Sequence, residues 1–235
     1  MKIPIRNLYF LLAYAWDRLE EADSLKISPN DFDDAANLLA RLLISGVQKI
    51  IKTGLERCYV EHEAEYRGIK GKLLLTETVK KQLHRKGRTV CAFDEYTKNS
   101  VNNRILKSTL IAIKKAPSIN KEQRQEASDC LEHFLETDSE LLGSQIFQRA
   151  RIGRSNVHYK LPLKVSEMIY QHSFVDEKSG DTVFRDFLRE EKAMARLYED
   201  FLFNFYKREQ RRFSVKRENI EWHTAEESAY QHLLP

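Results

Sequence analysis

The sequence predicts an α+β fold in which helices dominate and a small β-sheet is inserted between them. Apolar residues recur at three- and four-residue spacing through most of the 235 residues, which is the pattern of amphipathic helices. Segments 55–65 and 89–96 instead alternate, or are rich in β-branched and aromatic side chains, as strands are. With 42% apolar residues, 8 Gly and 5 Pro, the composition is typical of a helix-rich globular protein.

Start and stop signals give the order of the elements. A first helix is predicted directly after Pro4, and a second from Ser28 and Pro29 to a stop at Gly54. The two strands follow, with a helix after Thr76 between them that Gly87 closes. Further helices are predicted over 99–116, over 120–136 with an Asn cap, within 153–173 after a turn, and over 184–213. Residues 176–181 are the most linker-like segment, and 214–222 begin a possible strand.

Composition also limits the compartment and the partners. No apolar run is long enough to span a bilayer, and three widely spaced cysteines do not make a disulfide framework, so we expect a reducing, cytoplasmic location. The net charge is only +4, yet basic residues cluster in segments 80–88, 149–154 and 207–217. Such clusters attract phosphate backbones, although solvated helix faces also carry them.

Several kinds of catalytic site find no support. Cys58 and His62 lie on the same face of a predicted strand but about 13 Å apart, too far to share a metal ion by themselves. Cys91 joins them only if the two strands pair, so buried, inert cysteines are the better interpretation. Neither nucleotide-binding glycine motif is present, and no G-x-S-x-G occurs.

The acidic pair in "CAFDEYTKNSVNNRILKSTL" raises the question of a nuclease site, because carboxylates hold catalytic Mg²⁺. Asp94 and Glu95 are adjacent on a predicted strand, so their side chains point to opposite faces. They cannot both line one site without a bulge. The favoured interpretation is that one of them pairs with Arg104 or caps the following helix.

Between the strands, "RGIKGK" turns at Gly68 and Gly71. It lacks the strand–loop–helix frame of a phosphate-binding loop. The segment is predicted to present an exposed basic tip formed by Arg67, Lys70 and Lys72.

Taken together, five segments in the same order resemble the McrC subunit of McrBC-type 5-methylcytosine restriction systems. They are "IPIRNLYFLLAYAW", "RGIKGKL", "CAFDEYTKNSVNNRILKSTL", "NVHYKLPLKVSEMI" and "DFLREEKAMARLYEDFLFNFY". The resemblance implies a partner, an McrB-like AAA+ GTPase ring that binds GTP and carries the domain that reads DNA containing modified cytosine. It also implies that the amino-terminal part enters the ring and stimulates hydrolysis, and that the carboxy-terminal part resembles Mg²⁺-dependent PD-(D/E)xK nucleases used in phage defence.

The resemblance implies two domains: 1–175 as the GTPase-docking and activating domain, and 182–235 as the start of an incomplete nuclease domain, an α/β stub. The D…(D/E)xK residues of the family are not found before Pro235, so we expect no DNA cleavage by this chain alone. Glu191 and Glu199 are the only carboxylates that match a helical metal-assisting position, and no residue is assigned as a metal ligand or as binding a cofactor of its own.

Three functions follow from these observations. The leading one is a subunit that docks on the GTPase through Arg67, Lys70 and Lys72 and activates it. The alternatives are an endonuclease subunit whose catalytic half is removed or lies on another chain, and a nonspecific DNA-binding module built on a basic helix. The residues of that predicted DNA-binding surface are Lys207, Arg208, Arg211, Arg212, Lys216 and Arg217.

Overall fold

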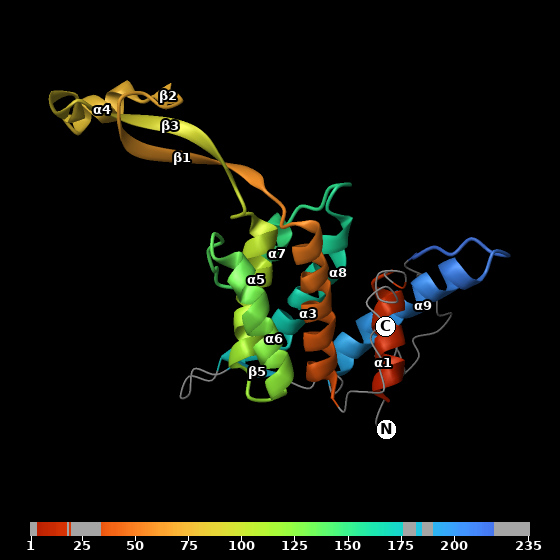
Figure 1. Ribbon diagram of the computed structural model, residues 1–235. Helices are drawn as coiled ribbons and strands as arrows, with labels where there is room; N and C mark the ends of the chain where they lie inside the picture. The colour runs from red at the N-terminus through yellow and green to blue at the C-terminus, as the bar shows by residue number, and fades with distance from the viewer. Residues whose placement is uncertain (1–3, 18, 20–33, 176–181, 185–189, 219–235) are drawn as a thin grey trace, which may run out of the picture.

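The computed structural model describes residues 4–17, 19, 34–175, 182–184 and 190–218. It consists of a helical body from which a β-arm projects (Figure 1). The arm is built from β1 (Cys58–Arg67), β2 (Lys72–Leu73), α4 (Leu75–Lys80), the 3₁₀ turn η2 (Leu83–Lys86) and β3 (Arg88–Thr97). The predicted α+β class, with dominant helices and a small sheet, is confirmed.

Four helices form the centre of the body: α3 (Ala35–Thr53), α5 (Val101–Lys115), α6 (Lys121–Leu131) and α8 (Lys160–Gln171). Their apolar stripes meet in one core, in which Leu43, Leu110 and Val165 are fully buried. Helices α3 and α8 touch so closely at Gly46 that a Cβ there would lie 2.6 Å from Pro162 Cγ. Short elements complete the body: η3 (Glu132–Phe134), α7 (Ser144–Arg149) and η4 (Val157–Tyr159).

Helix ends follow the capping residues in the sequence. The side chains of Asp34, Ser100 and Asn120 accept hydrogen bonds from the first turns of α3, α5 and α6. Gly54 ends α3 with a φ of 99°, which confirms the predicted stop. The predicted start at Ser28 and Pro29 lies outside the described residues.

Two predicted helices differ from the structure. Phe184 does not begin a long helix, because Thr182–Phe184 forms β5, which pairs antiparallel with β4 (Ser173–Val175). The helix is α9, Glu191–Glu209, so the run of β-branched and aromatic residues at 182–184 finds a strand partner that the helical pattern of the sequence did not reveal. The helix predicted up to Gly87 ends at Lys80, since Gln82 adopts a left-handed φ of 52° and a 3₁₀ turn follows.

Helix α9 packs on α1 (Ile5–Ala15), the helix predicted after Pro4. The Tyr14 ring contacts the rings of Phe201 and Phe205 edge-on, and Asn204 Nδ2 donates to the Ala15 carbonyl at 2.9 Å. The predicted linker 176–181 lies outside the described residues, and the strands on either side of it pair with each other. The boundary between 1–175 and 182–235 stays a prediction.

None of the helices among the described residues combines the length and apolar character needed to cross a bilayer.

Protonation of His172, the residue that follows α8, is expected to contribute to the pH dependence of stability. Its side chain is buried, with Nδ1 3.3 Å from a carboxylate oxygen of Glu190 just before α9. Burial lowers the pKa of His172 below its usual 6.5, more than Glu190 raises it. As pH falls through 6.5, the unfolded chain takes up a proton that the folded chain does not, so stability is lost until the lower, folded pKa is reached.

We therefore expect the unfolding free energy to fall less between pH 7.5 and 5.5 in His172→Gln than in the unchanged protein. Urea unfolding at both pH values measures this difference. Equal losses in the two proteins would contradict the assignment to His172.

Candidate functional site: a basic-tipped arm

The arm is a two-stranded ribbon that leaves the body and returns to it. Strands β1 and β3 pair antiparallel over their full length, from Cys58 opposite Thr97 to Arg67 opposite Arg88. Ten residues of strand span roughly 33 Å, which places the turn far from the helical core. Strand β2 pairs with the other edge of β3, at Ala92 and Cys91, giving the order β1-β3-β2.

The register settles how the acidic pair is oriented. Asp94 lies opposite Glu61 and Glu95 lies opposite Val60, so the two carboxylates occupy opposite faces of the ribbon, as the strand geometry predicts. The prediction that one of them pairs with Arg104 is wrong. A carboxylate oxygen of Glu95 lies 3.7 Å from His62 Nε2. Arg104 pairs instead with Glu140, because α5 directs its side chain toward the body. The cap of that helix is Ser100, not either carboxylate.

The tip of the arm, residues 68–87, packs on β3 through a small core formed by Leu83, Val90, Cys91 and Ala92. Thr78 of α4 ties the tip to β3, because its hydroxyl accepts from Val90 N–H at 2.9 Å. Gly71 is required here: its φ is 69°, and a Cβ would lie 2.5 Å from the Ala92 carbonyl oxygen. The turns predicted at Gly68 and Gly71 are confirmed.

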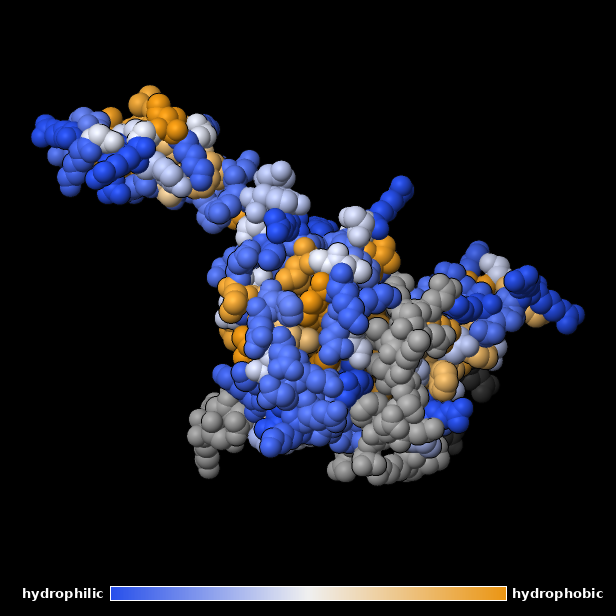
Figure 2. Space-filling model, in the orientation of Figure 1, coloured by the Kyte–Doolittle hydropathy of each residue, from blue (hydrophilic) through white to orange (hydrophobic). Residues whose placement is uncertain are grey.

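Basic and acidic residues are concentrated in different parts of the arm. Residues 68–87 contain six Lys or Arg against one Glu, whereas Glu61, Glu63, Glu65, Asp94 and Glu95 lie along the strands. Three exposed apolar side chains, Ile69, Leu75 and Val79, interrupt the basic surface of the tip. Figure 2 shows this apolar group on the otherwise hydrophilic arm.

Arg67, Lys70 and Lys72 all lie on the arm and all three are exposed, but Arg67 is opposite Arg88 at the far end of the ribbon, whereas Lys72 is opposite Ala92, four residues nearer the body. They are not equivalent. Lys70 is held on the arm, because its Nζ lies 3.8 Å from the centre of the Phe93 ring and 3.1 Å from the Tyr66 hydroxyl. In the described part of the chain neither Arg67 nor Lys72 has an ion-pair partner.

A buried hydrogen-bond network fixes the root of the arm. Asn103 Nδ2, on α5, donates to the carbonyls of Glu56 and Lys98, which flank β1 and β3, at 3.0 and 2.7 Å. Tyr159 donates its hydroxyl proton to Asn103 Oδ1 at 2.8 Å and accepts from Glu56 N–H at 2.8 Å. Burial raises the pKa of Tyr159, so the phenol stays protonated and remains a donor. We call these four residues the root clamp.

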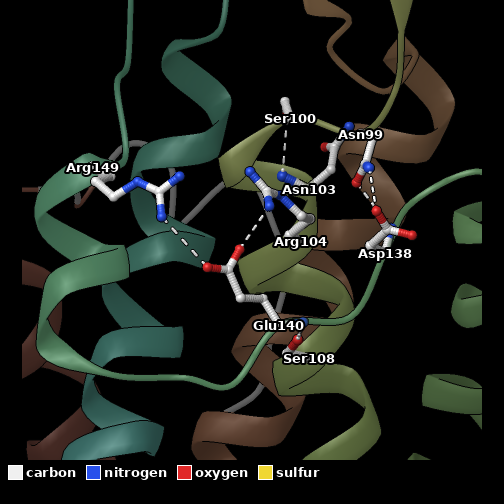
Figure 3. Close-up of polar contacts among 8 residues, drawn as sticks. All are labelled: Asn99, Ser100, Asn103, Arg104, Ser108, Asp138, Glu140 and Arg149. Atoms are coloured by element: carbon white, nitrogen blue, oxygen red, sulfur yellow. Dashed lines mark hydrogen bonds and ion pairs between the residues drawn. The ribbon is translucent and has the colours of Figure 1, made fainter. Parts of the chain in front are cut away.

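Further polar contacts lie beside Asn103 of the clamp (Figure 3). Asn99 and Asp138 exchange hydrogen bonds, and Arg104 pairs with Glu140 at 2.9 Å. Arg149 of α7 approaches the other Glu140 oxygen at 3.5 Å. Sequence reasoning missed the clamp, although one signal was present: two consecutive Asn residues stand on the inner face of a helix where most other buried residues are apolar.

No metal centre forms among the described residues, where no group of three His, Cys, Asp or Glu is placed to hold an ion. Cys91 lies opposite Ala64, well along the arm from Cys58 at its base, so Cys58, His62 and Cys91 do not converge. Burial raises the pKa of the Cys58 thiol, and Cys91 is buried. Both fit the interpretation of inert cysteines.

The described residues also do not fit Mg²⁺ at the carboxylates of α9. Glu191 and Glu199 are both exposed and are separated by two turns, or about 12 Å along the helix. Two carboxylates at that distance cannot share one ion. Neither residue is therefore assigned a catalytic role here.

The predicted basic helix of the DNA-binding surface is only partly helical. Helix α9 ends at Glu209, so Lys207 and Arg208 lie on it while Arg211, Arg212, Lys216 and Arg217 follow in an irregular segment. Arg217 turns back to pair with Asp200 and lies over the Phe203 ring. The chain leaves the helical path because Gln210 closes a local turn with Phe213.

A separate pocket of about 350 Å³ opens between α3 and α6. Burial raises the pKa of Cys130 in its wall to about 11, so this thiol stays protonated and is not a nucleophile at neutral pH. The lining residues are Gln48, Ile51, Lys52, Glu126, Asp129, Cys130 and His133.

Comparison with known proteins identifies the family. A family model described as "McrBC 5-methylcytosine restriction system component" matches residues 5–233. The chain belongs to the McrBC family. It is 30% identical over 220 residues to the "Type IV methyl-directed restriction enzyme EcoKMcrBC" of Escherichia coli (strain K12), covering 94% of this chain and 63% of that protein.

Solved structures share the fold of this McrBC-family chain. One is a chain of the Thermococcus gammatolerans McrBC complex, with a TM-score of 0.57 and 18% identity over 87% of this chain and 58% of that chain. Another, from an assembly of T. gammatolerans McrB AAA+ hexamers with bound McrC, has a TM-score of 0.55 and 17% identity over 85% and 46%. The chain thus spans between about half and two thirds of the length of these relatives.

Replacing Asn103 with Ala tests the root clamp. The change leaves the Tyr159 hydroxyl and two backbone carbonyls without their buried partner, so we expect a loss of about 2–4 kcal/mol in unfolding free energy. Denaturant unfolding measures the loss, and amide hydrogen exchange should accelerate at the base of the arm. Asn99→Ala is the matched control, expected to cost less than about 1 kcal/mol because its bonds to Asp138 are exposed. Equal effects of the two changes would contradict the clamp.

Proposed function

We propose that this chain is an McrC-like subunit of a modified-cytosine-specific restriction system, which docks on an McrB-like AAA+ GTPase ring and accelerates its GTP hydrolysis. The observation that carries the proposal is the basic tip held at the end of a firmly rooted arm. Membership of the McrBC family and a fold shared with chains from McrBC assemblies support it.

The chemistry of the tip suits a role in hydrolysis on the partner. Negative charge spreads over the phosphoryl oxygens in the transition state, and a cation supplied from a second protein stabilises it. In this proposal Arg67 and Lys72 act as the cations that reach the nucleotide, since both are exposed and unpaired among the described residues. Lys70 shapes the tip through its contacts with Phe93 and Tyr66.

DNA cleavage is proposed only for the restriction system as a whole. The E. coli relative is described as a restriction enzyme, and this chain spans 63% of its length. Because the described carboxylates are not arranged to hold Mg²⁺, we assign none of them a role in DNA cleavage.

GTP turnover by the cognate ring tests the proposal. Adding excess protein is expected to raise turnover, and Arg67→Ala with Lys72→Ala is expected to reduce the stimulation at saturation by tenfold or more, because transition-state charge loses its partner. Lys114→Ala with Lys115→Ala removes the same charge from the end of α5 that faces away from the arm and should leave stimulation intact. The proposal fails if turnover does not respond to the unchanged protein.

A second candidate, sequence-independent DNA binding, is favoured by the exposure of Arg211, Arg212 and Lys216. Replacing these three with Ala is expected to weaken binding to duplex DNA at all sequences. The slope of log K against log salt should decrease by about 2–3, close to one for each phosphate that is no longer neutralised. Fluorescence anisotropy between 50 and 200 mM salt measures the slope, with Lys114→Ala, Lys115→Ala and Lys121→Ala as the charge-matched control. An unchanged slope would remove this segment from the DNA-binding surface.

A further inference from the structure

Two tyrosines at the root of the arm are exposed side by side. Tyr59 and Tyr96 lie directly opposite each other on β1 and β3, with ring centres 5.0 Å apart. Their exposed fractions are 73% and 55%. The Arg57 guanidinium lies 5.7 Å from the centre of the Tyr96 ring, so the three side chains form one aromatic and cationic surface, which we call the root patch.

The root patch is held rigidly. Tyr59 is three residues from Glu56 and Tyr96 is two residues from Lys98, and both of these backbone segments are bound by Asn103 of the root clamp. Two neighbouring rings on a fixed backbone lose little further freedom when a partner covers them. Tyr and Arg are also among the residue types that supply most binding energy at protein interfaces. The patch therefore has the residue types and the fixed backbone expected of a binding hot spot.

The neighbouring charges disfavour nucleic acid as the occupant. On the same face of the ribbon, the next pair along the arm is Glu61 opposite Asp94. These carboxylates repel phosphate, so bases are not drawn to stack on the tyrosines. Like charges directly opposite each other also destabilise a strand pair. A partner that brings Lys or Arg beside them removes this repulsion, and this points to a protein surface with basic side chains.

We propose that the root patch is a second docking point, which inserts Tyr59 and Tyr96 into an apolar pocket flanked by basic side chains on the protein that receives the arm. This inference rests on the proposed function, because the receiving protein is the GTPase ring. The ribbon runs from the root to the tip without interruption, so a protein that encloses the roughly 33 Å of the arm meets the root at its mouth. Contacts at the root patch then contribute affinity for the ring, and the cations of the tip stimulate its GTP hydrolysis.

Two measurements with the cognate ring GTPase separate the two roles. Binding is measured in the presence of a non-hydrolysable GTP analogue, and turnover is measured with GTP. The double change Tyr59→Ala and Tyr96→Ala is expected to weaken binding at least tenfold while leaving turnover at saturating protein close to normal. Tyr59→Phe with Tyr96→Phe keeps the rings and should retain binding. Tyr206→Ala is the matched control, since this tyrosine is 52% exposed on α9, away from the arm.

Charge reversal provides an independent variant. Glu61→Lys with Asp94→Lys is expected to weaken binding to the ring at low salt, and the loss should shrink as salt is raised, because screening reduces repulsion from a basic pocket. Thermal unfolding confirms that each variant is folded. Stronger binding by the reversed variant would overturn the assignment of a basic pocket.

The outcomes distinguish this inference from the proposed function. If the unchanged protein does not bind the ring, both fail. If it binds and stimulates but the Tyr59 and Tyr96 double variant behaves identically, only the root patch fails. If the double variant instead loses binding to duplex DNA containing 5-methylcytosine, measured in parallel, the patch contacts nucleic acid and the inference is overturned.

Discussion

The side chain of Asn103 is the interaction on which the arm depends. A two-stranded ribbon is marginally stable in water, and this one projects beyond the helical core that would otherwise cover it. A single buried amide satisfies the carbonyls of Glu56 and Lys98, and so fixes both strands where they leave the body. Tyr159 closes the network from η4, and its buried phenol stays protonated because burial raises its pKa.

The clamp also explains why polar residues occupy the inner face of α5. Asn103 is fully buried on the inner face of α5, where Asn102 and Thr109 are also buried and the remaining buried residues, such as Ile105 and Leu110, are apolar. A buried amide is costly unless its donors and acceptor are all paired, and here they are. Arg104, one residue later, points to Glu140 and holds the segment that runs beside the root. The stretch that first suggested a metal site is thus structural in its helical part.

Basic and acidic residues are unevenly distributed along the arm. Six Lys or Arg lie within residues 68–87 and five carboxylates lie along the strands, and Glu65 connects the two groups because it pairs with Lys81 and Arg88. The three cations singled out by the sequence differ in their contacts: Lys70 lies over the Phe93 ring, whereas Arg67 and Lys72 have no ion-pair partner among the described residues.

The sequence by itself determined the elements whose signals are local. The cap at Asn120, the stop at Gly54, the turns at Gly68 and Gly71 and the alternation of β1 all act over a few residues, so a local pattern is enough to encode them. The opposite orientation of Asp94 and Glu95 followed from strand geometry alone. Tertiary structure decided which residues meet across the chain: Asn103 with Glu56 and Tyr159, Arg104 with Glu140, and β4 with β5. Such contacts join segments separated by up to 56 residues in these cases, and their partners are selected by packing of the whole body, which no local pattern encodes.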